Sequence, residues 1–487
     1  MNTERKYGAR RAPRQAMPEK PSFMDHFRGL LTSWEPAFKQ FRTFERVVNA
    51  VVGLLACQGR GTLTNSIMYR GQEQADWSAD YKAFNRSEWK ASDLFKSVLL
   101  EAIKEQPAKA PLVLAMDDTS LPKTGTKIPQ ARWCHDPLAP KFLDMPIQWG
   151  IRMLHAAIIV PNYVNHRPLA LSVAFEPIPA VEKVKNTESL SEAELAALEA
   201  AKKEASLTTR AVRLIASIRK SLDESGEKRR KLLIVADSSF TNGATIGHLP
   251  ANTEFIGRFR KNARVYAPTP KKEGKRIYGE VLPTPEQFRQ NPEIPFQNVE
   301  LHYGGGLREI RFKEIQNILW KDGTRGRVMR LLIVMPIPYK VVGRRKRGYN
   351  NPAYLLTTDL TSPAAQLVQA YLDRWQIEVL HRDLKAGIGV GQVQAFSHAA
   401  NERVHGATVA AYSMLNLAGL RTFNGKRTED YPDLPAWRKR KPPMRPSQHD
   451  LVSMLRNNLA DVWTQEQRRM RRPKGWVLSP RETYQAA

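Results

Sequence analysis

Two short apolar segments that each end in aspartate constrain the fold of this 487-residue chain more than any other feature. The first covers residues 112–116 and is followed by Asp117 and Asp118, and the second covers residues 232–236 and is followed by Asp237. Continuous apolar runs of this length, ending abruptly in acids, are typical of buried strands. Ligand sites in α/β sheets collect at the carboxyl ends of strands, so we expect these acids to converge.

The segments around these strands alternate between strand-like and helical patterns. The pattern predicts strands over residues 151–160 and 168–175. It predicts a helix over residues 184–204, with Ser191 and Glu194 placed as a capping box. A second helix is expected over 208–222, before the strand that ends at Asp237. This strand, helix, strand order predicts an α/β sheet core.

Other stretches of the chain differ in composition from this core. Residues 22–108 are helical in pattern, and a proline-rich stretch with strand-like runs lies between about 258 and 339. We therefore expect a mixed sheet core, interrupted by a β-rich insertion and flanked by helical N- and C-terminal regions. The predicted boundaries are a basic flexible arm (1–21), a helical DNA-binding domain (22–108), the first part of the core (109–260), the insertion (261–345), the second part of the core (346–400) and a basic helical C-terminal region (401–487).

The charge of the chain indicates a polyanionic partner. Lys and Arg total 76 against 48 acids, a formal net charge of +28, which favours nucleic acid. A basic loop supplies candidate DNA-binding side chains, which are Arg344, Arg345, Lys346 and Arg347. Only two cysteines occur, without a CxxC pair, which excludes a disulfide framework and a cysteine-rich zinc site. No apolar run approaches the ~18 residues of a membrane span, so we expect a soluble cytoplasmic protein with no membrane partner.

A third acid, Glu378, lies in a segment with clear start and stop residues for a helix. Ser362 followed by Pro363 predicts a helix start, and Gly387 predicts its end. At about 100° per residue, one face of this helix presents a narrow polar stripe. The stripe consists of Tyr371, Arg374, Glu378 and Lys385, with His381 at its edge. Taken alone, the stripe is equally typical of charge pairs on an exposed helix face.

Three carboxylates together have a specific chemical use. Hard divalent cations prefer carboxylate oxygens, and two such ions about 3.5–4 Å apart hold the attacking and leaving oxygens of a phosphodiester. A cationic side chain beside Glu378 depresses its pKa, and arginine also binds phosphate oxygens bidentately. The residues therefore suggest metal-dependent phosphoryl transfer on DNA.

The spacing Tyr371-x2-Arg374-x3-Glu378-x6-Lys385 resembles the Tyr-Arg-Glu-Lys signature of bacterial insertion-sequence transposases of the DDE type. Asp118-Thr119 resembles the first catalytic motif, in the Asp-Asp-Thr branch of that family, and Asp237-Ser238 resembles the second. The resemblance implies a ribonuclease-H-like core and cut-and-paste transposition at terminal inverted repeats. It also implies Mg²⁺, with Mn²⁺ as a substitute, held by Asp118, Asp237 and Glu378, and a homodimer on DNA. It places the protein in a bacterial cytoplasm, associated with the nucleoid, with Tyr371, Arg374 and Lys385 contacting DNA.

Asp117 competes with Asp118 for the first site position. Adjacent residues of a strand face opposite sides of a sheet, so at most one of them points into the site. We choose Asp118 because the resemblance places the catalytic aspartate immediately before threonine. Two other functions stay open at this point: a metal-dependent nuclease with the same core, and a DNA-binding regulator whose carboxylates are structural.

Overall fold

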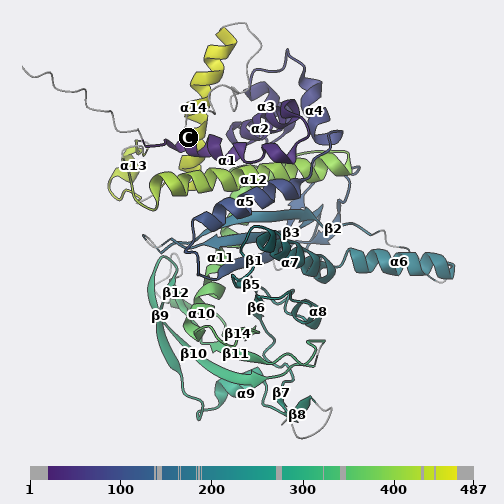
Figure 1. Ribbon diagram of the computed structural model, residues 1–487, viewed down its shortest axis with the longest axis vertical. Helices are drawn as coiled ribbons and strands as arrows, with labels where there is room; N and C mark the ends of the chain where they lie inside the picture. Colours follow the sequence, from purple (N-terminus) through teal and green to yellow (C-terminus); the bar gives the residue numbers. More distant parts are fainter. Residues whose placement is uncertain are drawn as a thin grey trace, which may run out of the picture.

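The computed structural model describes residues 20–468, apart from 137–138, 140–144, 163, 165, 182–183, 185–186, 188, 270–276, 322, 341–346, 429–430, 432 and 444–445. A ten-stranded sheet forms the centre of the molecule (Figure 1), with the order β2-β3-β1-β5-β6-β14-β11-β10-β9 and with β4 added beside β3. Its strands are β1 (Leu112–Pro122), β2 (Arg132–His135), β3 (Ile147–Val160), β4 (Leu169–Pro177), β5 (Leu232–Ala236), β6 (Thr253–Arg258), β9 (Gln297–Tyr303), β10 (Gly306–Ile318), β11 (Met329–Val334) and β14 (Ala353–Thr357).

The part of the sheet that contains the two apolar strands has a mixed topology. β1, β5 and β6 run parallel, whereas β3 pairs antiparallel with both β1 and β4. The spatial order β4-β3-β1-β5-β6, with this pattern of directions, is the ribonuclease-H-like arrangement. The expected mixed α/β fold, with helical regions at both ends of the chain, is thus confirmed.

The β-rich stretch between β6 and β14 is inserted in sequence but continues the sheet in space. β14 pairs with β6, and β11, β10 and β9 extend the sheet beyond it. The expected β-rich insertion thus separates two parts of the core in sequence and enlarges the sheet in space, because its strands satisfy their backbone hydrogen bonds on the free edge of β14. Shorter elements project from this extension, namely α9 (Pro285–Gln290) and the pairs β7 (Tyr266–Pro268) with β8 (Tyr278–Val281) and β12 (Pro338–Lys340) with β13 (Arg347–Tyr349).

Helices from both ends of the chain cover the β3–β4 side of the sheet. The N-terminal helices are α1 (Phe23–Thr32), α2 (Phe41–Ala56), α3 (Leu63–Tyr69), α4 (Trp77–Asn85) and α5 (Ala91–Lys104). The long helix α12 (His398–Phe423) and α5 both contact β4, and α1 and α2 pack against α12 (Figure 1), which is buried around most of its circumference. Its alanine-rich sequence suits this position, because small side chains let several elements pack closely on all sides. α14 (Gln448–Arg468) packs against α2 and α12.

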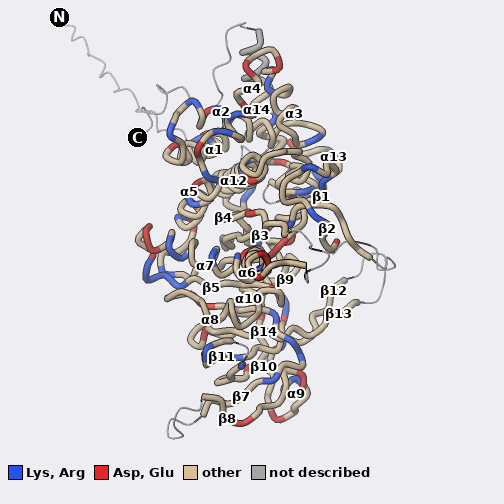
Figure 2. The backbone as a smooth tube through the Cα atoms, turned by 90° about the vertical axis from the view of Figure 1, so that its right-hand side faces the viewer, with Lys and Arg blue, Asp and Glu red and all other residues tan. Residues whose placement is uncertain are grey.

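The remaining helices lie at other positions along the chain. α6 (Glu192–Glu204) begins at the predicted Ser191–Glu194 capping box and projects from the body of the molecule (Figure 1), and α7 (Leu207–Glu224) precedes β5. Two short helices are α8 (Gly243–Gly247) and α13 (Ala436–Lys439). Lys and Arg occur in the helical and the sheet parts alike (Figure 2). Among the described residues, no helix is both long enough and apolar enough to cross a bilayer.

The helix predicted over residues 363–386 forms as α10 (Ala364–Asp373) and α11 (Trp375–Arg382), which meet at Arg374 and continue into a π-helical turn, Asp383–Gly387. Its first residue is one later than expected, because Pro363 is the N-cap. The Ser362 hydroxyl does not cap the helix but donates to Asp359 Oδ2 at 2.6 Å.

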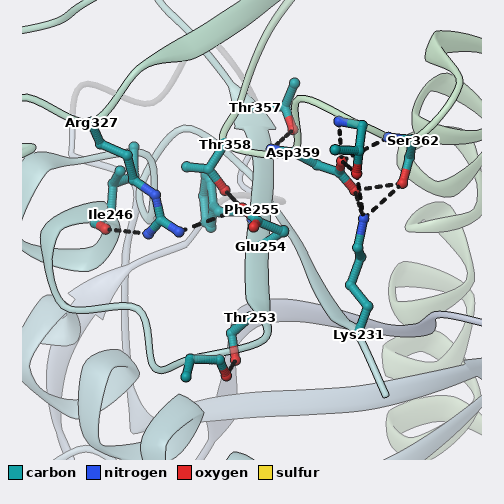
Figure 3. Close-up of polar contacts among 12 residues, drawn as sticks. Lys231, Ile246, Thr253, Glu254, Phe255, Arg327, Thr357, Thr358, Asp359 and Ser362 are labelled. Atoms are coloured by element: carbon teal, nitrogen blue, oxygen red, sulfur yellow. Dashed lines mark hydrogen bonds and ion pairs between the residues drawn. The ribbon is translucent and has the colours of Figure 1, made fainter. Parts of the chain in front are cut away.

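A buried acid anchors the start of α10 to the start of β5. Asp359 Oδ2 accepts from Lys231 Nζ at 2.9 Å, and Oδ1 accepts from the Ser362 backbone N–H at 2.9 Å (Figure 3). Burial alone would raise the pKa of Asp359, but the hydrogen bonds from Ser362 and Lys231 outweigh it and hold the pKa well below its usual range. Since β5 leads to Asp237 and α10 leads to α11, this network ties together the two elements that carry predicted site acids.

Candidate active site

The first two site acids are aligned by the register of parallel strands. β1 and β5 pair so that Met116 stands opposite Ala236. The next residue on each strand is an aspartate, so Asp117 and Asp237 occupy matching positions at the carboxyl ends of neighbouring strands. Val113 and Val235, at the same parity on these strands, pack in a cluster with Leu367 of α10. Asp117 therefore points to the face of the sheet that α10 and α11 cover. Asp237 lies one residue past the end of β5, and its carboxylate accepts from the Ser239 backbone N–H at 2.8 Å and from the Ser239 hydroxyl at 3.2 Å.

Arg374 joins two of the acids directly. Its Nη1 lies 3.3 Å from Asp117 Oδ2 and its Nη2 lies 2.6 Å from Glu378 Oε1. The Arg374 side chain is only 13% exposed, so this bridge is shielded from water. The Arg374–Glu378 contact is an i,i+4 pair of the kind that the alternative interpretation describes, whereas the Arg374 contact to Asp117 of β1 lies outside that interpretation.

The pKa of Asp117 is shifted by burial and by the charged groups around it. Burial raises the pKa of Asp117 to about 7, against the opposing effect of Arg374, and the charges of Asp237 and Asp118 raise it further. A buried carboxyl group whose pKa is strongly raised beside other acids is a marker of functional sites. A cation placed beside it would favour its ionised form.

Asp118 lies on the opposite face of β1. Arg152 of β3 holds its carboxylate bidentately, with Nε at 2.6 Å from Oδ2 and Nη2 at 3.0 Å from Oδ1. The expectation that Asp118, rather than Asp117, points toward Glu378 is therefore wrong. The physical reason is the alternation of side chains along β1, which continues as a strand through both acids to Pro122.

The other members of the stripe also lie near the acids. Burial raises the pKa of the Tyr371 hydroxyl, opposed by Arg374, and the charges of Asp237 and Glu378 add to the rise. Burial lowers the pKa of Lys385, and the charges of Asp136 and Asp117 oppose that effect. These couplings place Tyr371 in electrostatic range of two acids and Lys385 in range of the third.

A buried histidine pair fixes α11 against β3. His381 Nε2 lies 2.8 Å from Nδ1 of His155, which is fully buried and stands opposite Asp117 in the β1–β3 register. Burial, followed by the charges of Lys385 and Arg374, lowers the pKa of His381 to about 3. Both rings are therefore neutral at physiological pH, and they hold the helix to the sheet without adding charge to the site.

The donor set suits a hard divalent cation in its chemistry. Asp117, Asp237 and Glu378 present carboxylates from a strand, the end of a second strand and a helix. In this structure a guanidinium stands between two of them, as a stand-in for a metal cation. Within the described part of the chain, no three Asp, Glu, His or Cys side chains are close enough to hold one ion together. Shared ligation of one ion thus requires these carboxylates to move from the positions they have here.

The side chains of the predicted basic loop lie outside the described part of the structure. Arg344, Arg345 and Lys346 lie outside the described residues, and Arg347 begins β13 with its side chain not described.

Two site residues, Arg152 and His155, were not singled out from the sequence, and a third, Asp117, was weighed against Asp118 and not chosen. Arg152 and His155 lie within a predicted strand and have no local motif, so no signal pointed to them. Asp117 had one: if the two five-residue apolar runs are aligned end to end as parallel strands, Asp117 falls beside Asp237.

With the geometry established, comparison with known proteins identifies the class. The family model described as "DDE superfamily endonuclease" matches residues 36–327, more than half of the chain, and the chain belongs to this family. A second model, "Archaeal putative transposase ISC1217", matches residues 324–422, which contain α10 and α11. The predicted function of a DNA transposase, an enzyme that cleaves DNA and transfers phosphoryl groups, is thereby confirmed.

Structural and curated comparisons add little to the family assignment. A cryo-EM structure of the piggyBac transposase synaptic complex with hairpin DNA matches 93% of this chain and 83% of its own, at 12% identity and a TM-score of 0.37. No curated protein matches the chain.

Proposed function

We propose that this transposase cuts and rejoins DNA at the ends of an insertion sequence, using Asp117, Asp237 and Glu378 as its catalytic carboxylates. The observation that carries the proposal is the Arg374 bridge between Asp117 and Glu378, beside a strand register that aligns Asp117 with Asp237. Asp117 takes the role that the sequence pattern suggested for Asp118.

The three carboxylates would hold divalent cations, with Mg²⁺ as the proposed ion and Mn²⁺ as its substitute. When bound, such ions supply Lewis-acid activation of the attacking and leaving oxygens of a phosphodiester. The chain's own cations act on the DNA. Arg374, released from its carboxylates, can bind a phosphate bidentately, and Lys385 contributes a point charge from the turn after α11. The Tyr371 hydroxyl lies within the same stripe and can donate to a phosphate oxygen.

The finer identity is also a proposal. The Tyr371, Arg374, Glu378 and Lys385 spacing supports membership in the Tyr-Arg-Glu-Lys group of bacterial insertion-sequence transposases. The substrates would be duplex DNA with terminal inverted repeats and a target duplex, and the working form a homodimer on DNA. The net charge of +28 supports binding to DNA without regard to its sequence. We place the protein with the nucleoid of a bacterial cytoplasm.

A labelled terminal inverted repeat tests the proposal. Purified full-length chain is incubated with the labelled end, with and without Mg²⁺, and the products are separated by size. We expect a nick at the element end only with the metal, followed by joining of the freed 3′ end to a second duplex. Cleavage without joined products would indicate a nuclease of the same core. Binding without any cleavage in Mg²⁺ or Mn²⁺ would indicate a regulatory DNA-binding protein.

A further inference from the structure

A buried lysine lies just past the strand that carries Asp117. Lys123 is 6% exposed, and its Nζ lies 2.9 Å from the Gly391 carbonyl oxygen, 2.7 Å from the Val393 carbonyl oxygen and 3.0 Å from His405 Nε2. An ammonium has three donors and no acceptor, and here each donor has a partner. Burial lowers the pKa of Lys123 to about 7, and the three hydrogen bonds favour its charged form.

The histidine partner is oriented to receive the lysine. His405 Nδ1 lies 2.5 Å from the carbonyl oxygen of Asn401, which can only accept. The hydrogen of the neutral ring is therefore on Nδ1, and the lone pair of Nε2 faces Lys123. Burial lowers the pKa of His405 to about 3, so the ring stays neutral and does not repel the ammonium.

The lysine follows β1, whereas its three acceptors belong to segments that come after Glu378 in the chain. Lys123 follows the end of β1, six residues after Asp117. Gly391 and Val393 lie in the segment that leaves α11 and its π-helical turn, and His405 belongs to α12. One side chain thus joins the strand of the first acid to the segment that leads away from Glu378.

We propose that Lys123 is a positioning residue for catalysis: its three hydrogen bonds set the spacing between the β1 strand that carries Asp117 and the helix that carries Glu378. The inference rests on the proposed function, because it concerns the spacing of the carboxylates that would hold the metal. It adds a second link between β1 and the segment that follows Glu378, besides the Arg374 bridge. When Arg374 leaves the carboxylates, the Lys123 link remains.

The same chain contains a matched control. Lys313 of β10 is 1% exposed, and its Nζ faces the carbonyl oxygens of Phe288, Arg289 and Asn291 at 3.4, 2.9 and 2.6 Å. It ties β10 to the end of α9, and four strands separate β10 from β1 in the sheet. At ~4.8 Å per strand, that places the control roughly 24 Å from β1.

The experiment compares Lys123→Met with Lys313→Met in the full-length chain bound to an uncleaved end. Mn²⁺ binding is followed by electron paramagnetic resonance, single-turnover cleavage is followed against Mg²⁺ concentration, and thermal unfolding is recorded for each protein. For Lys123→Met we expect about 10-fold weaker Mn²⁺ binding and a matching rise in the half-saturating Mg²⁺ concentration, the size typical of losing a residue that orients metal ligands. Lys313→Met should lose comparable thermal stability and keep the metal affinity of the wild type.

If Lys123→Met does not fold, His405→Leu removes one acceptor and leaves the lysine in place, and the same shift in metal affinity is expected at smaller size. Equal metal affinity in wild type and in the folded Lys123 or His405 variant overturns the inference, as does an equal loss in Lys313→Met. A wild-type chain that neither binds Mn²⁺ nor cleaves would instead reject the proposed function, so the two failures are distinguishable.

Discussion

The two faces of the sheet at the end of β1 hold adjacent aspartates in different surroundings. On one face Asp117 is aligned with Asp237, shares Arg374 with Glu378 and has a pKa raised by burial to about 7. On the other face Asp118 forms a bidentate pair with Arg152. Arg152 makes two hydrogen bonds to Asp118, whereas Arg374 makes one contact to Asp117 and shares its charge with Glu378, so Asp117 has more capacity for a further cation. The charged groups around each aspartate, and not its position in the sequence motif, therefore distinguish Asp117 from Asp118.

The largest effect should come from neutralising each aspartate in turn. Asp117→Asn is expected to reduce Mg²⁺-dependent nicking on the order of 1,000-fold, because several kcal/mol of transition-state stabilisation depend on metal ligation. Asp118→Asn is expected to reduce it by less than about 10-fold, since it loosens a salt bridge on the far face. Single-turnover cleavage of a labelled end measures both rates.

End binding is the control, because affinity depends mostly on phosphate contacts and should survive in both variants. Asp237→Asn and Glu378→Gln should match Asp117→Asn. A result in which Asp118→Asn is inactive and Asp117→Asn is active would restore the motif-based assignment and reject the one drawn from the sheet.

The second-largest difference is expected between substitutions of the arginines on the two faces, in the rates of cleavage and joining. Arg374→Lys is expected to slow cleavage and joining by roughly 10- to 100-fold, chiefly the later strand attack, because a lysine cannot reproduce a planar bidentate fork. Arg152→Lys, on the face away from Glu378, should stay within a few-fold of the wild type. Assaying nicking and joining separately at fixed Mg²⁺ makes the comparison. Equal activity of wild type and Arg374→Lys in both steps would reduce the bridge to an ordinary ion pair.

A smaller difference is expected in the salt dependence of DNA binding. Lys385→Ala should lower the slope of log affinity against log salt by about one, as expected when one phosphate contact is lost. The double variant Asp118→Asn with Arg152→Gln removes a compensated pair of charges and should leave the slope unchanged. Titrations of one duplex at several salt concentrations give both slopes. An unchanged slope in Lys385→Ala would mean that this lysine does not contact a phosphate in the complex.

The smallest effect concerns stability on the Glu378 side of the sheet. Burial raises the pKa of Asp373, in α10, from 3.8 to about 6, opposed by a hydrogen bond from Gln369 Nε2 at 2.8 Å. Because the folded pKa is raised, the stability that this group contributes is present below pH 3.8 and is lost as the pH rises through 6. Asp373→Asn should therefore be more stable than the wild type above pH 6, by at most about 2–3 kcal/mol.

Chemical denaturation at pH 4 and pH 8 checks this expectation. The two proteins should unfold alike at pH 4 and differ at pH 8. An equal difference at both pH values would mean that the substitution acts through packing and not through ionisation.

Local patterns in the sequence determined most of the elements of this protein. Apolar runs marked β1 and β5, the capping box marked the start of α6, and the spacing of Tyr371 and Arg374 placed both on one helix face. Such signals are local because they depend on the period of a single strand or helix. The family-level function also follows from the sequence, since it rests on residue types at fixed spacing.

Only the tertiary structure decided which residues meet. The pattern of β1 shows that Asp117 and Asp118 face opposite sides, but which side is covered by α11 depends on the packing of segments more than 250 residues apart. The Arg152–Asp118 pair and the Lys123 hydrogen bonds likewise join residues far apart in the chain, and no local sequence pattern predicts these contacts. The sequence of a strand shows which side chains share a face. Which of the two faces lines the site depends on the elements that pack against it.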